Sequence, residues 1–273
     1  MPSPTFIALA PQGRKQRLEY AWTGAATTDQ PILVFLHEGL GSIALWRDFP
    51  ERLCARLGRR GLAYSRMGYG ASTPRPHDEP LPRHYLRREA VETLPALLEA
   101  LDVAPRKPWL IGHSDGGSIA LLAASFNAAS YSGIVVIAPH YFVEDVCLKG
   151  IRRASAAFET GGLRARLARY HQDVDGAFYG WRDIWLDPAY RDWNIETELK
   201  RITCPVLAIQ GDADEYATLE QIDGIRRQAP QTELRVLPQC GHSPHLQQPE
   251  STLDAIGAFI RAHTQTATPS PET

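Results

Sequence analysis

The pattern with the clearest chemical meaning is Gly112-His113-Ser114-Asp115-Gly116, in which a serine lies between two glycines. It follows a predicted strand at 109–112 and precedes a predicted helix at 116–126. A sharp strand-to-helix turn holds a serine in a strained backbone conformation with its hydroxyl exposed, and the glycines leave room for neighbouring backbone. The alternative is a glycine-rich turn whose serine caps the helix. The flanking elements favour a nucleophile at Ser114.

A serine hydroxyl is a weak nucleophile at neutral pH, so it needs a general base that is itself oriented by a carboxylate. The predicted strand at 206–210 is followed by three carboxylates, those of Asp212, Asp214 and Glu215. The last predicted strand is followed by two histidines, His242 and His245. These histidines have no third metal ligand at a suitable spacing, so we expect no metal site. The chain therefore offers a serine, an acid and a histidine in that order.

The composition argues against several functional classes. The 273 residues include 29 basic and 31 acidic side chains, without the positive excess that binding to a nucleic-acid backbone requires. Apolar runs such as 32–36 are too short to span a bilayer, and residues 1–14 lack the pattern of a signal peptide. The four cysteines include no close pair, which favours reduced thiols. We expect a cytoplasmic protein that binds neither nucleic acid nor membranes.

Short β-type segments alternate with helical ones, which predicts an α/β fold with a mostly parallel sheet flanked by helices. Eight strands are expected, at 5–10, 17–22, 31–36, 62–65, 109–112, 134–138, 206–210 and 233–237. Helices are expected at 45–57, 85–101, 116–126, 219–227 and 253–263, with an interruption near Pro95. Residues 143–200 have helical segments and no convincing strand, so they read as an insertion after the sixth strand. The polar residues 264–273 are expected to be a disordered tail.

These motifs resemble those of the α/β-hydrolase superfamily, in its serine hydrolase branch. The resemblance covers about 31–263 and is carried by His37-Glu-Gly39, Leu45-Trp46-Arg47, Ser65-Arg66-Met-Gly68-Tyr-Gly70, Gly112-His-Ser114-Asp-Gly116, Gly211-Asp-Ala-Asp214 and Gly241-His242. It implies an α/β-hydrolase core formed by 1–142 and 201–263, with 143–200 as a small helical cap. It also implies that Ser114, Asp214 and His242 are the catalytic residues, because the family's acid and base occupy those motif positions.

Acyl transfer further requires hydrogen-bond donors aimed at the developing oxyanion. The backbone N–H of Asp115, directly after the nucleophile, is one expected donor. The resemblance implies a second donor in the loop after the third strand, at Gly39 with Leu40 as its neighbour. Glu38 stands where the family commonly has a glycine, so the shape of this loop is expected to differ.

The side chains around the nucleophile do not decide which substrate the chain would bind. The carboxylate of Asp115 either compensates the helix dipole or faces a substrate amino group, as the resemblance to valacyclovirase-like and biphenyl hydrolase-like esterases implies. Glu38 would add a second carboxylate for a cation. Six aromatic residues gather within the insertion, namely Phe178, Tyr179, Trp181, Trp185, Tyr190 and Trp193. Most are expected to pack the cap, with Trp181, Trp185 and the nearby Tyr141 and Leu40 as candidates for contact with substrate.

The prediction is a serine hydrolase that cleaves a small or medium carboxylic ester through an acyl-enzyme and needs no cofactor. Hydrolysis of a C–C bond in a ring-cleavage product, of a thioester or of an amide would use the same three residues, and the pocket decides among them. From another class, the chain could be a non-catalytic ligand sensor on a hydrolase scaffold. The natural substrate and the oligomeric state are left open.

Overall fold

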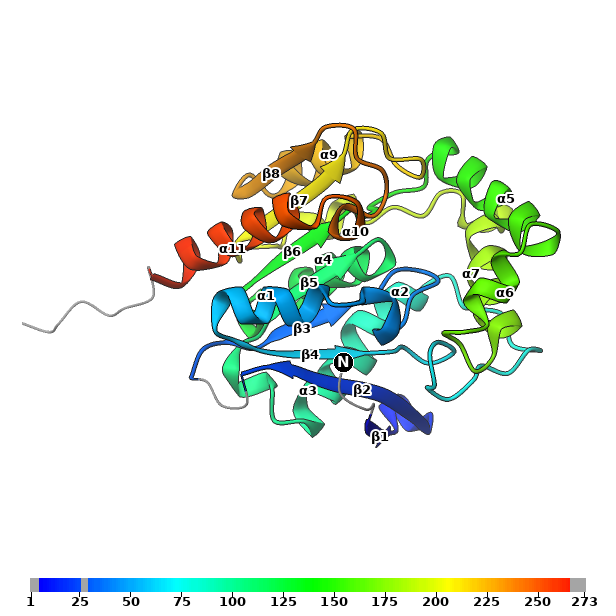
Figure 1. Ribbon diagram of the computed structural model, residues 1–273, viewed down its shortest axis with the longest axis horizontal. Coiled ribbons are helices and arrows are strands. Elements are labelled where there is room, and N and C mark those ends of the chain that lie inside the picture. Colours follow the sequence, from blue (N-terminus) through cyan, green and yellow to red (C-terminus); the bar gives the residue numbers. More distant parts are fainter. Residues whose placement is uncertain (1–4, 26–28, 266–273) are drawn as a thin grey trace, which may run out of the picture.

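The computed structural model describes residues 5–25 and 29–265, and its centre is an eight-stranded sheet (Figure 1). The strands are β1 (Thr5–Leu9), β2 (Gln16–Gly24), β3 (Leu33–Leu36), β4 (Arg60–Tyr64), β5 (Trp109–His113), β6 (Gly133–Ile137), β7 (Val206–Gly211) and β8 (Thr232–Leu237). They are ordered β1-β2-β4-β3-β5-β6-β7-β8, and only the β1–β2 and β2–β4 pairs are antiparallel. The predicted mostly parallel, eight-stranded sheet is confirmed.

The central strands are apolar on both faces because helices cover both sides of the sheet (Figure 1). In β3, Leu33 and Phe35 join the core beneath α1 (Phe49–Leu57) and α11 (Pro249–Gln265). Val34 and Leu36 face the opposite side and join the second core. The helices of that second side are α2 (Tyr85–Arg88), α3 (Leu94–Ala100), α4 (Asp115–Asn127) and α9 (Glu220–Gln228). Alternate residues of one strand thus anchor two layers of helices.

Two predicted helices are divided in the structure. The segment predicted at 45–57 forms a 3₁₀ turn, Ile43–Trp46, and α1 begins only at Phe49, where Pro50 fits the first turn because it has no N–H to donate. The segment predicted at 85–101 is interrupted by a π-helical turn at Glu89–Thr93, just before Pro95 in the first turn of α3. The interruption expected near Pro95 is therefore present, in the turn that precedes the proline.

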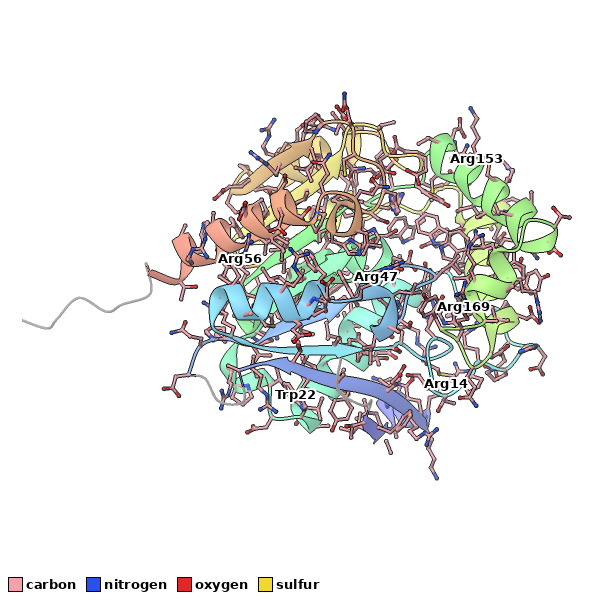
Figure 2. All side chains as sticks on the ribbon, in the orientation of Figure 1. Arg14, Trp22, Arg47, Arg56, Arg153 and Arg169 are labelled. Carbon is pink, nitrogen blue, oxygen red and sulfur yellow. The ribbon has the colours of Figure 1, made fainter. Side chains whose placement is uncertain are left out.

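Between β6 and β7 the chain forms α5 (Asp145–Glu159), α6 (Leu163–Leu167), α7 (Val174–Leu186) and α8 (Glu196–Leu199). We call residues 143–200 the cap segment; all of them are described, and none belongs to a strand of the sheet. Helices α5, α6 and α7 stand together as a separate layer beside one end of the sheet (Figure 1). Arg153, which Figure 2 labels on α5, donates to the carbonyl oxygen of Glu215 at 3.1 Å.

Aromatic side chains form much of the interior of the cap segment. Phe158 of α5 stacks on Phe178 of α7, and Tyr190 stacks on Trp193.

At the C-terminal end of the chain, α11 extends to Gln265, so the predicted tail begins inside a helix at 264. The other residues of that predicted tail, 266–273, lie outside the described part. Among the described residues, no helix is both long and apolar enough to cross a membrane.

Candidate active site

Ser114 lies in the turn between β5 and α4, with backbone angles of φ 52° and ψ −117°. A positive φ is unfavourable for a residue with a Cβ atom, so this turn holds strain at the serine. The two glycines of the motif explain how the turn packs. A Cβ at Gly116 would overlap the carbonyl oxygen of Leu36, and a Cβ at Gly112 would overlap that of Gly116. Only glycine therefore lets the elbow approach β3 this closely.

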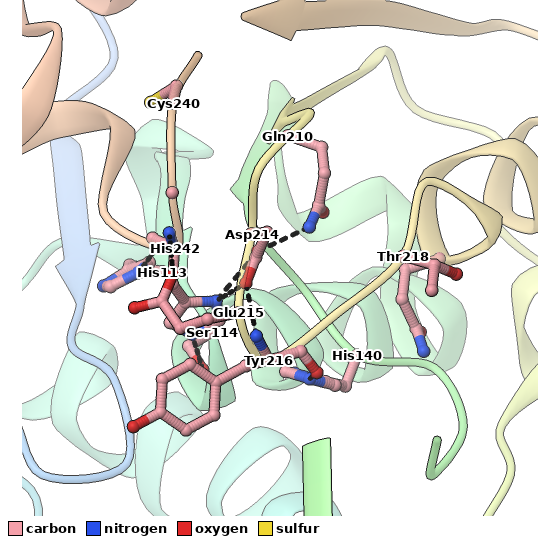
Figure 3. A network of polar contacts seen from close by, with 12 residues as sticks. His113, Ser114, His140, Gln210, Asp214, Glu215, Tyr216, Thr218, Cys240 and His242 are labelled. Atoms are coloured by element: carbon pink, nitrogen blue, oxygen red, sulfur yellow. Dashed lines mark hydrogen bonds and ion pairs between the residues drawn. The ribbon is translucent and has the colours of Figure 1, made fainter. Parts of the chain in front are cut away.

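Ser114, His242 and Asp214 are joined by hydrogen bonds, although they come from three distant parts of the chain (Figure 3). The Nε2 atom of His242 lies 3.0 Å from the Ser114 hydroxyl, and its Nδ1 atom lies 2.9 Å from both carboxylate oxygens of Asp214. Because a carboxylate only accepts, Nδ1 carries the proton and Nε2 presents a lone pair to the serine. The imidazole can therefore take the hydroxyl proton when the oxygen attacks.

Contacts from β7 and the loop after it hold the acid in place (Figure 3). Gln210 donates its amide N–H to Asp214 Oδ2 at 2.5 Å, and the backbone N–H of Tyr216 donates to Oδ1 at 2.8 Å. Burial alone would raise the pKa of Asp214, but the hydrogen bond from His242 and the Tyr216 N–H hold it below its ordinary value. The carboxyl group is therefore ionised and ready to orient the imidazole.

Two further histidines, His113 and His140, lie next to His242. His113 donates from Nε2 to the carbonyl oxygen of His242 at 2.8 Å, and His140 donates from Nε2 to the carbonyl oxygen of Tyr216 at 3.3 Å. Burial lowers the pKa of His140, and the neighbouring His242 lowers it further, so its ring is neutral. Sequence reasoning missed His140. The available signal was its place just after β6, at the carboxyl edge of the parallel strands where ligands bind in such sheets.

Gly39 and Asp115 bring two backbone donors to one cavity, which Ser114 also lines. Within residues 5–25 and 29–265, neither their N–H groups nor that of Leu40 has an acceptor. The indole of Trp181 packs so closely on Gly39 that a Cβ there would overlap it. Free N–H groups beside a nucleophile can stabilise an oxyanion.

The loop that carries Gly39 is shaped by the side chain of Glu38. This carboxylate folds back over Gly41, where a Cβ would overlap it, and lies 3.6 Å from Nδ1 of His113. Burial would raise the pKa of Glu38, yet the adjacent imidazole of His113 holds it far below its ordinary value. The glutamate at this unusual position is thus engaged with the site's own imidazole.

Asp115 is buried, with only 1% of its surface exposed. Its Oδ2 atom accepts from the hydroxyl of Tyr85 at 2.8 Å and pairs with the Arg66 guanidinium at 3.5 Å. A carboxylate already held by a cation and a hydroxyl is not available to a substrate amino group. The structure therefore disagrees with the substrate-facing interpretation of Asp115 and favours a structural role.

The cavity next to Ser114 has a volume of about 350 Å³. Its apolar lining comes from Leu40, Cys147, Ile151, Leu163, Trp181 and Trp185, and its polar lining includes Glu38, His140 and Glu215. Four of the candidates for contact with substrate, Leu40, Trp181, Trp185 and Glu38, therefore line this cavity. This volume is at the lower end of the roughly 300–1,000 Å³ of small-molecule sites.

The prediction for Tyr141 is wrong. Its backbone N–H donates to the side chain of Gln221, and its hydroxyl donates to Glu220 at 3.4 Å. Its ring packs on Gly224, so the side chain turns toward α9 and does not line the cavity. His140, the residue before it, lines the cavity instead.

Comparison with known proteins identifies related chains. The family model described as Alpha/beta hydrolase family matches residues 33–255. The sn-1-specific diacylglycerol lipase ABHD11 of Mus musculus is 24% identical over 84% of this chain and 81% of that protein. Serine hydrolase BPHL of Homo sapiens is 29% identical over 68% of this chain and 64% of that protein, so the match spans slightly less than two thirds of it.

Solved structures show the same fold. A proline iminopeptidase of Mycobacterium smegmatis superposes with a TM-score of 0.75 at 19% identity, covering 97% of this chain and all (100%) of that one. A thermophilic esterase of Thermogutta terrifontis superposes with a TM-score of 0.71 at 19% identity, covering 95% and 99% of the two chains. At this level of identity the likeness concerns the fold alone.

Proposed function

We propose that this chain, which belongs to the alpha/beta hydrolase family, is a serine hydrolase that cleaves small or medium carboxylic esters. The observation that carries the proposal is the hydrogen-bonded series Ser114–His242–Asp214 beside two backbone N–H groups that have no acceptor in the described part of the chain. A nucleophile, an oriented base and an oxyanion site are the three parts that acyl transfer requires.

In the proposed mechanism, the Ser114 oxygen attacks the ester carbonyl while Nε2 of His242 takes the hydroxyl proton. The N–H groups of Gly39 and Asp115 donate to the resulting oxyanion. When the tetrahedral intermediate collapses, the C–O bond to the alcohol breaks and His242 passes its proton to the leaving oxygen. A water molecule then attacks the acyl-enzyme by the same route and releases the acid. Asp214 orients the imidazole and stabilises its charged form throughout.

The cavity supports a substrate of limited size with apolar parts. The cap segment supplies Trp181 and Trp185 from α7 as well as Ile151 and Leu163, and we take it as the cap that closes over the acyl group. The four cysteines, Cys54, Cys147, Cys204 and Cys240, are buried and free, which supports the proposal of a reducing compartment such as the cytoplasm.

The test is hydrolysis of a panel of 4-nitrophenyl esters graded in acyl length, with aminoacyl and matched neutral members. Short and medium acyl chains should be cleaved fastest, and mass spectrometry of quenched reactions should find the acyl group on Ser114. Because Asp115 and Glu38 are held by the protein itself, aminoacyl esters should gain less than about threefold over neutral ones, under ~1 kcal/mol. A large aminoacyl preference would contradict this account of the two carboxylates.

The rival activities have their own readouts on the same protein. Turnover of a vinylogous diketone without ester hydrolysis would support C–C bond cleavage, and thioester or amide panels separate those two classes. A folded protein that turns over none of these, and whose melting temperature rises with a ligand equally in wild type and Ser114→Ala, would support a sensor instead.

Gly39→Ala is expected to lower kcat/KM for a short ester by about 10- to 100-fold, because the new Cβ overlaps the Trp181 indole and displaces an oxyanion donor. Steady-state kinetics on the purified variant measure this effect. Gly257→Ala is the matched control, since it adds the same methyl group on α11, away from the cavity. Shortening the indole in Gly39→Ala/Trp181→Leu should restore part of the loss; a Gly39→Ala enzyme with unchanged kinetics would remove Gly39 from the oxyanion site.

A further inference from the structure

Two buried hydrogen bonds connect the cap segment to the residue after the nucleophile. Trp185 of α7 donates its indole N–H to the Tyr85 oxygen at 3.0 Å, and Tyr85 donates its hydroxyl proton to Asp115 Oδ2 at 2.8 Å. The direction of both bonds is fixed, because an indole only donates and a carboxylate only accepts. Trp185, Tyr85 and Asp115 are all buried, so this connection is shielded from water.

The connection continues from Asp115 to the segment that carries Gly39, the second proposed oxyanion donor. The buried guanidinium of Arg66 contacts Asp115 Oδ2 at 3.5 Å and donates to the carbonyl oxygen of Glu38 at 2.8 Å. The backbone N–H of Arg66 also donates to Nε2 of His37 at 3.0 Å. Glu38 immediately precedes Gly39, so one arginine ties together the two segments that carry the oxyanion donors. Although burial alone would lower the pKa of Arg66, the Asp115 carboxylate raises it above its ordinary value, so the bridge is charged.

Helix α7 is linked to both donor residues, Gly39 and Asp115. Trp181 and Trp185 are one turn apart and therefore lie on the same face of the helix. Trp181 packs directly on Gly39, and Trp185 reaches Asp115 through Tyr85. A displacement of α7 would thus act on both N–H groups at once.

We propose that Tyr85 is a positioning residue that couples the cap segment to the oxyanion site. Its hydroxyl group holds the Asp115 N–H in its donor position while Trp185 donates to Tyr85. This inference rests on the proposed function. Without the Tyr85 hydroxyl, the Trp185 N–H and one acceptor position of Asp115 lose their partner in a buried environment, and the local structure must shift to satisfy them. A small misplacement of an oxyanion donor weakens its interaction with the transition state more than substrate binding.

The experiment compares Tyr85→Phe with Tyr190→Phe. Tyr190 contacts both Tyr85 and Trp185 in the same aromatic cluster, but its buried hydroxyl has no hydrogen-bond partner among the described residues, so the control removes the same atom without breaking a bond. The readouts are kcat and KM for a short ester and the rate constant for inactivation by a fluorophosphonate. Tyr85→Phe should lower kcat and the inactivation constant by about tenfold or more with KM within about threefold, and Tyr190→Phe should change each by less than about twofold.

A double-mutant cycle tests the connection itself. Trp185→Phe should lower kcat by several-fold in the wild type and by much less in Tyr85→Phe, because the bond it removes is already absent there. If Tyr85→Phe does not fold, as judged by its melting transition, Trp185→Phe alone decides. A folded Tyr85→Phe that reacts like wild type, or that raises KM alone, would overturn the inference. A wild-type protein that neither hydrolyses esters nor reacts with the fluorophosphonate would overturn the proposed function instead.

Discussion

Ser114→Ala is expected to lower kcat for ester hydrolysis by a factor on the order of 10⁵ or more, the scale seen when a serine nucleophile is removed. The loss is large because the hydroxyl beside Nε2 of His242 is the atom that forms the acyl-enzyme in the proposed mechanism. Steady-state kinetics measure the rate, and the acyl adduct seen by mass spectrometry should vanish with it.

The same position offers a control for stability. Ser114 has a φ of 52°, which glycine adopts without penalty and alanine does not. Ser114→Gly should therefore be equally inactive but more stable than Ser114→Ala, by about 1 kcal/mol in the free energy of unfolding. Urea titrations of the two variants give this difference. Residual activity above about a hundredth of wild type in either variant would mean that another group is the nucleophile.

The sheet and the three residues Ser114, Asp214 and His242 at its edge could be predicted from the sequence, because the patterns that mark them are short and local. Strands buried on both faces are short apolar runs between turn residues, as in β3, so their positions could be read directly. The elbow also depends on its own neighbourhood: Gly112 and Gly116 are required by backbone contacts inside one turn and with the adjacent strand. Family motifs then placed Asp214 and His242 at the ends of later strands.

The side-chain directions around the site could not be predicted, because they depend on contacts between distant segments. Asp115 turns inward only because Arg66 and Tyr85, 49 and 30 residues earlier, meet it there. No periodicity or spacing marks such a meeting. The failure at Tyr141 has a smaller cause: Ala138 has a φ of 47°, so the chain bends after β6, and His140 faces the cavity where its neighbour was expected.

Loss of the carboxylate at position 214 is the second change with a large expected effect on kcat. Asp214→Asn is expected to lower kcat by about 10⁴-fold while leaving the site assembled, because an uncharged amide can no longer stabilise the imidazolium or enforce its tautomer. The Tyr216 N–H must keep an oxygen opposite it, so the new NH₂ group should occupy the position of Oδ2. Gln210 can adapt by turning its own amide oxygen, which has no partner within the described residues, toward that NH₂ group. Asp212→Asn, two residues earlier and outside the series Ser114–His242–Asp214, is the control and should retain activity within about threefold.

The free energies of unfolding of the wild type and of Asp214→Asn should depend differently on pH. The pKa of Asp214 is lowered in the folded protein, so its ionised form contributes stability above the ordinary carboxyl pKa of about 4 and loses that contribution as the pH falls through the lower folded value. The difference in unfolding free energy between wild type and Asp214→Asn should therefore be largest near neutral pH and shrink below about pH 4. Denaturant titrations across this range measure it. A difference that grew with acid would mean that the carboxyl is protonated in the native site, and a protonated Asp214 could not stabilise the imidazolium that the proposed mechanism requires.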